Sequence, residues 1–418
     1  MPIQGIPIVS AETAPLFPRD TFELPADILW LSHCKDGPIP CASAQRLTDL
    51  LSTELHPWSL RWNEDFLDIQ ASLRQAGATL FGVDAKDISL TTCTSTGLQA
   101  VSLGYPWKEG DEVLIPVGEF PSNRLPWLAL ECKGVRCREV ALWPGQAVNA
   151  AVPPDASIEP EQRLLDAIGP STRIVSVSWV RYQDGVRLDL AKLGRGCRER
   201  GVHLVVDGIQ GAGTMVPSFE GVSAFATGGH KGLLGLQGQG LLWTDPVFRE
   251  SLMPVGTWLS APDAFSQSGT QAAASSPWAA DGRRLEAGSP SILSCAALAS
   301  SIQILLDHGG APAIQAHVVG LQKALLAELA GSAAWASEAG RLDGLVRAGK
   351  VGSILSFVLS TDHCERLWKA AEAGGISTSI REGYLRIAFH GWHSGQDVER
   401  CAAWLLTASS SVDSGTHC

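Results

Sequence analysis

Two residues of opposite charge, Asp207 and Lys231, have the sequence surroundings of a catalytic pair. Asp207 ends the apolar run 204–206, so we expect it at the carboxyl end of a buried strand. Lys231 lies in a glycine-rich turn after a second apolar run, 222–226. At one edge of a parallel sheet, such a pair can hold the two poles of a pyridoxal phosphate ring. The amine forms a Schiff base with the aldehyde, and the carboxylate keeps the pyridine nitrogen protonated.

Neighbouring segments offer the other contacts that this cofactor needs. Backbone N–H groups and hydroxyls at a helix start bind phosphate, and Ser95 and Thr96 open a predicted helix. Phe120 follows another predicted strand and can stack on the ring. Gln210, just beyond the carboxylate, can donate to the phenolic oxygen, and His230, beside the lysine, can contact the phosphate.

Each of these residues alone also has an ordinary structural explanation. An aspartate at a strand end is often a helix cap, and a single lysine is usually on the surface. The segment 94–97 alone is a generic helix start, Phe120 alone fits a core, and Gln210 and His230 alone are loop residues. Their order along the chain and their placement at strand ends favour a shared site.

The composition is typical of a two-domain globular enzyme. A chain of 418 residues exceeds one ordinary core, and 45% of its residues are hydrophobic. A formal charge of −11 without Lys or Arg runs argues against nucleic acid or anionic membrane partners. The amino terminus has no secretion signal, and no apolar run reaches membrane-spanning length. Ten scattered cysteines without a CxxC pair predict a cytoplasmic location and no metal site.

Strand and helix patterns alternate through the first part of the chain. We predict strands at 111–115, 174–179, 202–206, 222–226 and 240–243, with helices at 96–103 and 190–200. This alternation predicts a mainly parallel sheet with helices on both faces, and ligands bound beyond the carboxyl ends of its strands.

The later part of the chain has a different pattern. After a loop rich in Ala, Ser and Gln at 260–282, we predict helices at 293–308, 314–329, 364–373 and 396–406, and strands at 353–359 and 384–389. This order indicates a second domain of the α+β class.

The combined motifs resemble those of the class V aminotransferases. They are Thr-Ser-Thr-Gly at 94–97, Glu-Phe-Pro-Ser-Asn at 119–123, Val-Val-Asp-Gly-x-Gln at 205–210 and Gly-His-Lys at 229–231. This family of pyridoxal phosphate (PLP) enzymes includes cysteine desulfurases, isopenicillin N epimerase-like proteins, C–S lyases and kynureninase. The likeness covers nearly the whole chain. It implies the PLP-dependent transferase fold type I, an α/β class with a mainly parallel seven-stranded sheet and a smaller α+β C-terminal domain.

The resemblance also implies roles for individual residues. Lys231 would carry the Schiff base, Asp207 would pair with the pyridinium and Gln210 would donate to the phenolate. Phe120 would stack on the ring, and the phosphate would be bound by Ser95, Thr96 and His230.

Two further residues take their implied roles from the same likeness. Ser289, in Glu-Ala-Gly-Ser-Pro, would reach the phosphate of the neighbouring subunit, which implies a homodimer with shared active sites; its structural alternative is a helix cap. Arg386 would bind the substrate carboxylate through two parallel hydrogen bonds, and its structural alternative is an ion pair. Arg381 is a weaker candidate for the same role. We expect an arm at 1–28 that joins the small domain, a PLP-binding domain at 29–265 and a small domain at 266–418.

One departure from the family bears on the reaction. Desulfurases carry a mobile cysteine after an Arg-x-Gly element, whereas Arg381-Glu-Gly383 is followed by Tyr-Leu-Arg. We therefore favour a C–S lyase that eliminates the β-substituent of a cysteine-derived amino acid. Transamination, epimerisation, decarboxylation and a non-catalytic binding protein stay open as alternatives.

Overall fold

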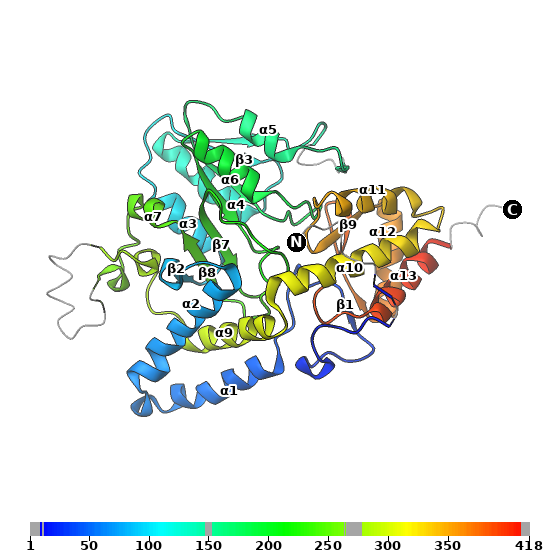
Figure 1. The fold of residues 1–418 in the computed structure, drawn as a ribbon, viewed down its shortest axis with the longest axis horizontal. Helices are drawn as coiled ribbons and strands as arrows, with labels where there is room; N and C mark the ends of the chain where they lie inside the picture. The colour runs from blue at the N-terminus through cyan, green and yellow to red at the C-terminus, as the bar shows by residue number, and fades with distance from the viewer. Residues whose placement is uncertain (1–8, 11, 147–152, 263, 265–277, 411–418) are drawn as a thin grey trace.

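The structure is a computed structural model that describes residues 9–10, 12–146, 153–262, 264 and 278–410 (Figure 1). A layered α/β body lies on the left of the view, and the last helices of the chain lie on the right. The predicted loop at 260–282 falls largely outside the described residues.

The body is organised around a seven-stranded sheet in the order β2-β8-β7-β6-β5-β3-β4. Its strands are β2 (Ile88–Thr91), β3 (Glu112–Pro116), β4 (Arg136–Val140), β5 (Thr172–Ser178), β6 (His203–Asp207), β7 (Val222–Gly228) and β8 (Gly240–Thr244). Only β8 runs in the direction opposite to the other six strands, which confirms the predicted mainly parallel sheet. Apart from β4 at one edge, these strands are almost wholly buried, because helices cover both faces.

Alternate residues of each strand enter different cores. In β6, Val205 packs in the core with α3 (Thr94–Gly104) and α4 (Pro121–Leu128). Leu204 and Val206 pack in the other core, which includes residues of α2 (Asp68–Phe81), α5 (Pro160–Asp166) and α6 (Leu190–Glu199). This two-residue period fixes which face of the sheet each side chain occupies.

The second part of the chain forms an antiparallel sheet in the order β11-β12-β9. Its elements are β9 (Ile354–Val358), β11 (Ser379–Arg381), β12 (Tyr384–Ala388), α10 (Gly310–Ala330), α11 (Ala336–Arg347), α12 (Thr361–Ala373) and α13 (Gly395–Ser410). The start of the chain joins this unit, since β1 (Leu29–Trp30) pairs in parallel with β10 (Ile376–Ser377).

The helix α9 (Ile292–Asp307) packs against α1 (Cys41–Leu55) and α2, although the predicted boundary assigns it to the small domain. The division of the chain into an arm and two domains stays a prediction. The remaining elements are α7 (Pro246–Ser251), η2 (Arg19–Thr21), η3 (Pro57–Ser59), η4 (Trp62–Leu67), η5 (Ala85–Asp87), η6 (Ala129–Lys133), η7 (Trp258–Ser260) and η8 (Gly282–Leu285).

Within the described ranges, no single helix has the length and apolar character needed to cross a membrane. Of the helices in those ranges, only α9 and α10 taken together meet that test of length and composition, and they are bent by 68° where they join.

Candidate active site

The carboxyl ends of five strands bring polar side chains to one small cavity. Residues that follow β2, β3, β5, β6 and β7 all contribute to it. Its lining consists of Thr94, Phe120, Ser122, Ser178, Val180, Tyr182, Asp207, Ile209, Gln210 and Lys231. The structure therefore brings together four of the residues that the sequence singled out, namely Phe120, Asp207, Gln210 and Lys231.

Asp207 is the last residue of β6, and only 3% of its surface is exposed. Burial raises the pKa of its carboxyl to about 7, and the nearby Glu119 acts in the same direction. The backbone N–H of Ile209 donates to Asp207 Oδ1 at 3.0 Å, which partly offsets this loss of solvation. A cation placed beside this carboxylate would stabilise its charged form, and a pyridinium nitrogen is such a cation.

Lys231 lies in the turn between β7 and β8. Burial lowers the pKa of its amine, and Asp207 opposes that shift. Its Nζ lies 5.9 Å from the centroid of the Phe120 ring, which itself packs edge-to-face on Tyr182 at 5.1 Å. An amine with a lowered pKa is neutral in a larger fraction of molecules, which suits it to act as a nucleophile or a base.

The start of α3 differs in detail from the sequence prediction. The Thr94 hydroxyl lines the cavity and is buried without a hydrogen-bond partner among the described residues. Ser95 Oγ donates to Ser122 Oγ at 2.8 Å. The Thr96 hydroxyl instead donates to the Cys93 carbonyl at 2.9 Å and accepts from the Cys93 N–H at 3.1 Å, so it closes the first turn of the helix. Phosphate binding by Ser95 and Thr96 stays a prediction.

Thr94 and Ser122 are therefore site residues that the sequence reasoning did not select. Both lie in segments that were singled out, at the first turns of α3 and α4. The signal available for Thr94 was its position as the first helical residue, where backbone N–H groups point out of the helix.

Two further predicted residues lie beside the lysine turn. The Gln210 amide nitrogen donates to the Cys34 carbonyl at 3.0 Å, and its buried oxygen has no partner in the described structure. The second N–H of this amide is still available for a phenolic oxygen. His230 is half-buried, and its backbone carbonyl accepts from the Gly37 N–H at 2.8 Å. The proposed cofactor contacts of Gln210 and His230 stay predictions.

Arg386, from the small sheet, does not line this cavity but contacts the backbone of Tyr182, which does. It lies in β12, only 3% exposed, with Nε donating to Ser379 Oγ at 3.0 Å and Nη1 donating to the Tyr182 carbonyl at 2.7 Å. Among the described residues, Nη2 has no hydrogen-bond partner. The positive charge of Arg386 lowers the pKa of Lys231. A guanidinium so oriented can bind a carboxylate, but its role stays a prediction.

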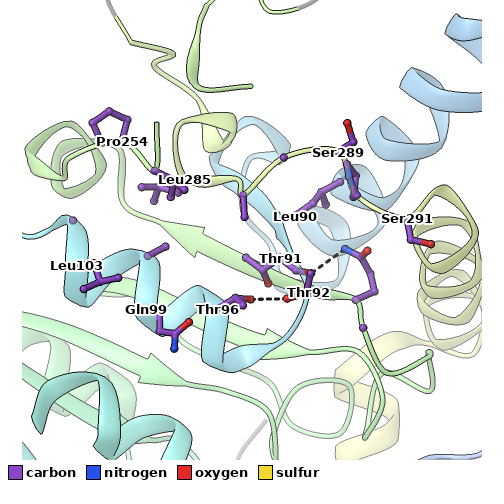
Figure 2. Close-up of a pocket in the computed structure, with 18 of the residues that line it drawn as sticks. Leu90, Thr91, Thr92, Thr96, Gln99, Leu103, Pro254, Leu285, Ser289 and Ser291 are labelled. Atoms are coloured by element: carbon purple, nitrogen blue, oxygen red, sulfur yellow. Dashed lines mark hydrogen bonds between the residues drawn. The ribbon is translucent and has the colours of Figure 1, made fainter. Parts of the chain in front are cut away.

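Ser289 belongs to a second, larger cavity of about 440 Å³ (Figure 2). Figure 2 shows it near the end of β2, with Thr96 and Gln99 of α3 in the same view. In the described structure no residue lines both cavities, so Ser289 does not complete the Lys231 cavity of its own chain.

The model of the family described as Aminotransferase class-V matches residues 51–383. The chain belongs to this family, which confirms the predicted family and its cofactor, pyridoxal 5′-phosphate.

Three comparisons show how distant the named relatives are. A probable cysteine desulfurase of Methanothermobacter thermautotrophicus is 30% identical over 44% of this chain and 43% of the relative. The isopenicillin N epimerase of Streptomyces clavuligerus is 28% identical over 56% of this chain and 58% of the relative. The chain thus spans about half the length of the curated relatives it matches. A solved mutant of C-DES, with glycine covalently linked to its PLP cofactor, covers 93% of this chain and 99% of its own. Its TM-score of 0.79 at 24% identity confirms the fold.

The residues present fit this cofactor. An aromatic face, a carboxyl partner for a ring nitrogen, an amine whose pKa is lowered by burial and the unpartnered polar atoms of Thr94 and Gln210 all belong to residues that line one cavity. In the described part of the chain, no group of three His, Cys, Asp or Glu side chains could hold a metal ion.

The raised pKa of Asp207 predicts how pH affects the cofactor-free protein. The folded state holds this proton up to about pH 7, whereas the unfolded chain releases it near pH 3.8, so stability falls as pH rises through that window. We expect Asp207→Asn to be more stable than the wild type at pH 8 by as much as about 4 kcal/mol, and the gap to close toward pH 4. Urea unfolding of the apo-protein at both pH values measures this, with the exposed Asp49→Asn as control. Parallel pH profiles for Asp207→Asn and wild type would contradict the assignment.

The unpartnered hydroxyl of Thr94 predicts a contact with the cofactor phosphate. We expect Thr94→Val, which keeps the shape but loses the hydroxyl, to raise the Kd for PLP about tenfold. Thr94→Ser keeps the hydroxyl and serves as the matched control, with a Kd close to that of the wild type. Titration followed by absorbance measures both, and equal Kd values for Thr94→Val and wild type would rule out the contact.

Proposed function

We propose that this protein is a PLP-dependent C–S lyase that acts on a cysteine-derived amino acid. The observation that carries the proposal is one cavity lined by the buried Asp207 and the partly buried Lys231, with Arg386 bonded to the carbonyl of Tyr182, another lining residue. This set supports the release of the α-proton from an amino acid whose carboxylate is held in place.

Each residue has one task in this proposal. The free Nη2 of Arg386 binds the substrate carboxylate and so fixes the α-carbon. The amine of Lys231 removes the α-proton, a role favoured by the burial that lowers its pKa. Asp207 keeps the ring nitrogen protonated, and PLP, when bound, supplies the electron sink for the α-carbon.

The proposed reaction is a balanced elimination. The α-carbon–hydrogen and β-carbon–sulfur bonds break, and the sulfur leaves with the bonding electrons and takes up a proton as a thiol. One water molecule then hydrolyses the remaining imine to pyruvate and ammonia. No oxidant or reductant is required.

Desulfurases carry a mobile cysteine after their Arg-x-Gly element, whereas this chain has a tight hairpin there. The lack of that cysteine favours elimination over transfer of sulfur to the enzyme. β11 and β12 are joined directly by Glu382 and Gly383. Cys364 and Cys401 are buried in α12 and α13. A structure of the cystine C–S lyase C-DES with its product cysteine persulfide shares the fold at a TM-score of 0.76 and 23% identity.

We further propose a homodimer whose active sites are shared. Ser289 opens onto the second cavity, which is lined by the exposed apolar side chains Leu103 and Met253, 61% and 64% exposed. A second copy seated on this face would remove apolar surface from water and bring its own groups to Ser289. The partners we propose are thus an amino-acid substrate and a second copy, with no nucleic acid and no membrane. A cytoplasmic location stays a prediction.

A substrate panel tests the reaction. We expect a cysteine S-conjugate to release pyruvate and a thiol in equal amounts, cystine to release pyruvate and cysteine persulfide in equal amounts, and Lys231→Ala to release none of them. Arg386→Lys should raise KM at least about tenfold because the single nitrogen of a lysine cannot replace a guanidinium that bonds Ser379, the Tyr182 carbonyl and the carboxylate at once. The surface variant Arg195→Lys serves as control. A keto acid that keeps the sulfur would select transamination, and an inverted stereocentre without pyruvate would select epimerisation.

Mixed dimers test whether the sites are shared. In a heterodimer of one Lys231→Ala chain and one Ser289→Ala chain, one shared site has both wild-type residues and the other has neither. We therefore expect half of its sites to bind PLP with wild-type affinity. If Ser289 served its own chain, no site would be fully wild type. Sedimentation of the wild type as a monomer at working concentration would also overturn the proposal.

A further inference from the structure

Three successive backbone carbonyls around the lysine each accept a hydrogen bond. The His230 carbonyl accepts from the Gly37 N–H at 2.8 Å, and the Lys231 carbonyl accepts from the Leu234 N–H at 3.1 Å. The Gly232 carbonyl is 3.0 Å from Nε2 of His390, a residue 158 positions away in the sequence. Of these three contacts, only the last comes from a side chain.

The hydrogen-bond pattern fixes the tautomer of His390. The Gly391 N–H donates to His390 Nδ1 at 2.7 Å, so Nδ1 carries no proton in the neutral ring. Nε2 therefore carries the hydrogen and donates it to the Gly232 carbonyl. Burial lowers the pKa of His390 to about 3, which keeps the ring neutral under ordinary conditions.

The surroundings of His390 hold its ring in one orientation. It is fully buried and stacks on Trp392, with ring centroids 4.6 Å apart and an angle of 14°. His33 packs edge-on at 5.2 Å. The other titratable groups that influence it are His317 and His393, and burial lowers the pKa of each of them as well. His393 Nδ1 accepts the backbone N–H of His390 at 2.9 Å, which fixes the main chain at this point.

The same short segment carries Arg386. β12 ends at Ala388, and the parallel bridge between Ala388 and Ser32 ties this end to the start of the chain. We propose that His390 is a positioning residue: through the Gly232 carbonyl it fixes the turn that carries Lys231 relative to the strand that carries Arg386. The contact sets where the amine stands with respect to the bound carboxylate.

The proposal rests on Lys231 as the cofactor-bearing lysine and does not depend on which reaction follows. Cofactor binding and the absorption spectrum of the loaded protein therefore test it without any amino-acid substrate. A failure of the C–S lyase proposal would leave this test intact.

Two variants of His390 distinguish the hydrogen bond of Nε2 to the Gly232 carbonyl from the hydrogen bond of Nδ1 to the Gly391 N–H. The amide nitrogen introduced by His390→Gln reaches about as far as Nε2 of the histidine, whereas the amide introduced by His390→Asn ends near the Nδ1 position. We expect His390→Asn to raise the Kd for PLP about tenfold, the loss expected for one hydrogen bond at a constrained site. It should also move the pH midpoint of the cofactor absorption change by about half a unit or more, because the amine then stands differently toward Asp207 and Arg386. His390→Gln should restore the Kd to within about twofold of the wild type and return the pH midpoint to the wild-type value.

A control separates positioning from general destabilisation. His203→Asn changes a half-buried histidine at the start of β6, at the opposite end of the strand from Asp207. We expect it to lower the melting temperature but leave the pH midpoint unchanged. The proposal is overturned if folded His390→Asn keeps the wild-type Kd and midpoint, or if His390→Gln is as impaired as His390→Asn. If His390→Asn does not fold, an impaired His390→Gln protein overturns the proposal, and an unimpaired one supports it.

Discussion

The loss of solvation at Asp207 and Lys231 is the constraint on which the site depends. Each charge is costly in a buried cavity, so the carboxylate is held back toward its protonated form and the amine toward its neutral form. A ring with a positive nitrogen and a reactive aldehyde relieves both costs at once. The cost of burying these two groups therefore favours binding of such a molecule. The same burial shifts their pKa values in the directions that the chemistry needs.

The sheet makes this arrangement possible because its topology delivers distant residues to one edge. Five strand ends contribute to a single cavity, and the strands themselves are buried on both faces by helices. The two cores described above hold the strands in register, so the side chains at their ends have little freedom to move. The small sheet adds Arg386 from outside, joined to the large unit by its bond to the Tyr182 carbonyl.

Much of this architecture was predictable because several strands that are buried on both faces have continuous apolar runs in the sequence. The strand that ends in Asp207 and the turn that holds Lys231 were both expected from that pattern. The edge strand β4 was missed because its residues are largely polar and half-exposed. Helices α1 and α2 were not predicted either. At the site, Thr94 and Thr96 have the same chemistry and lie two residues apart, so only the helix geometry shows that one faces the cavity and the other caps the helix. The tie from His390 to Gly232 joins residues too far apart for any local pattern to reveal.

The backbone at the lysine turn is held by Gly37, near the beginning of the chain, and by His390, near its end. A side chain on Gly37 would meet the Lys231 carbonyl at 2.3 Å, so the early segment must fit closely against the turn. This has a consequence for biosynthesis. A ribosome that has translated the whole seven-stranded sheet has not yet made the residue that completes the turn. The turn therefore gains this contact only after residue 390 has been synthesised.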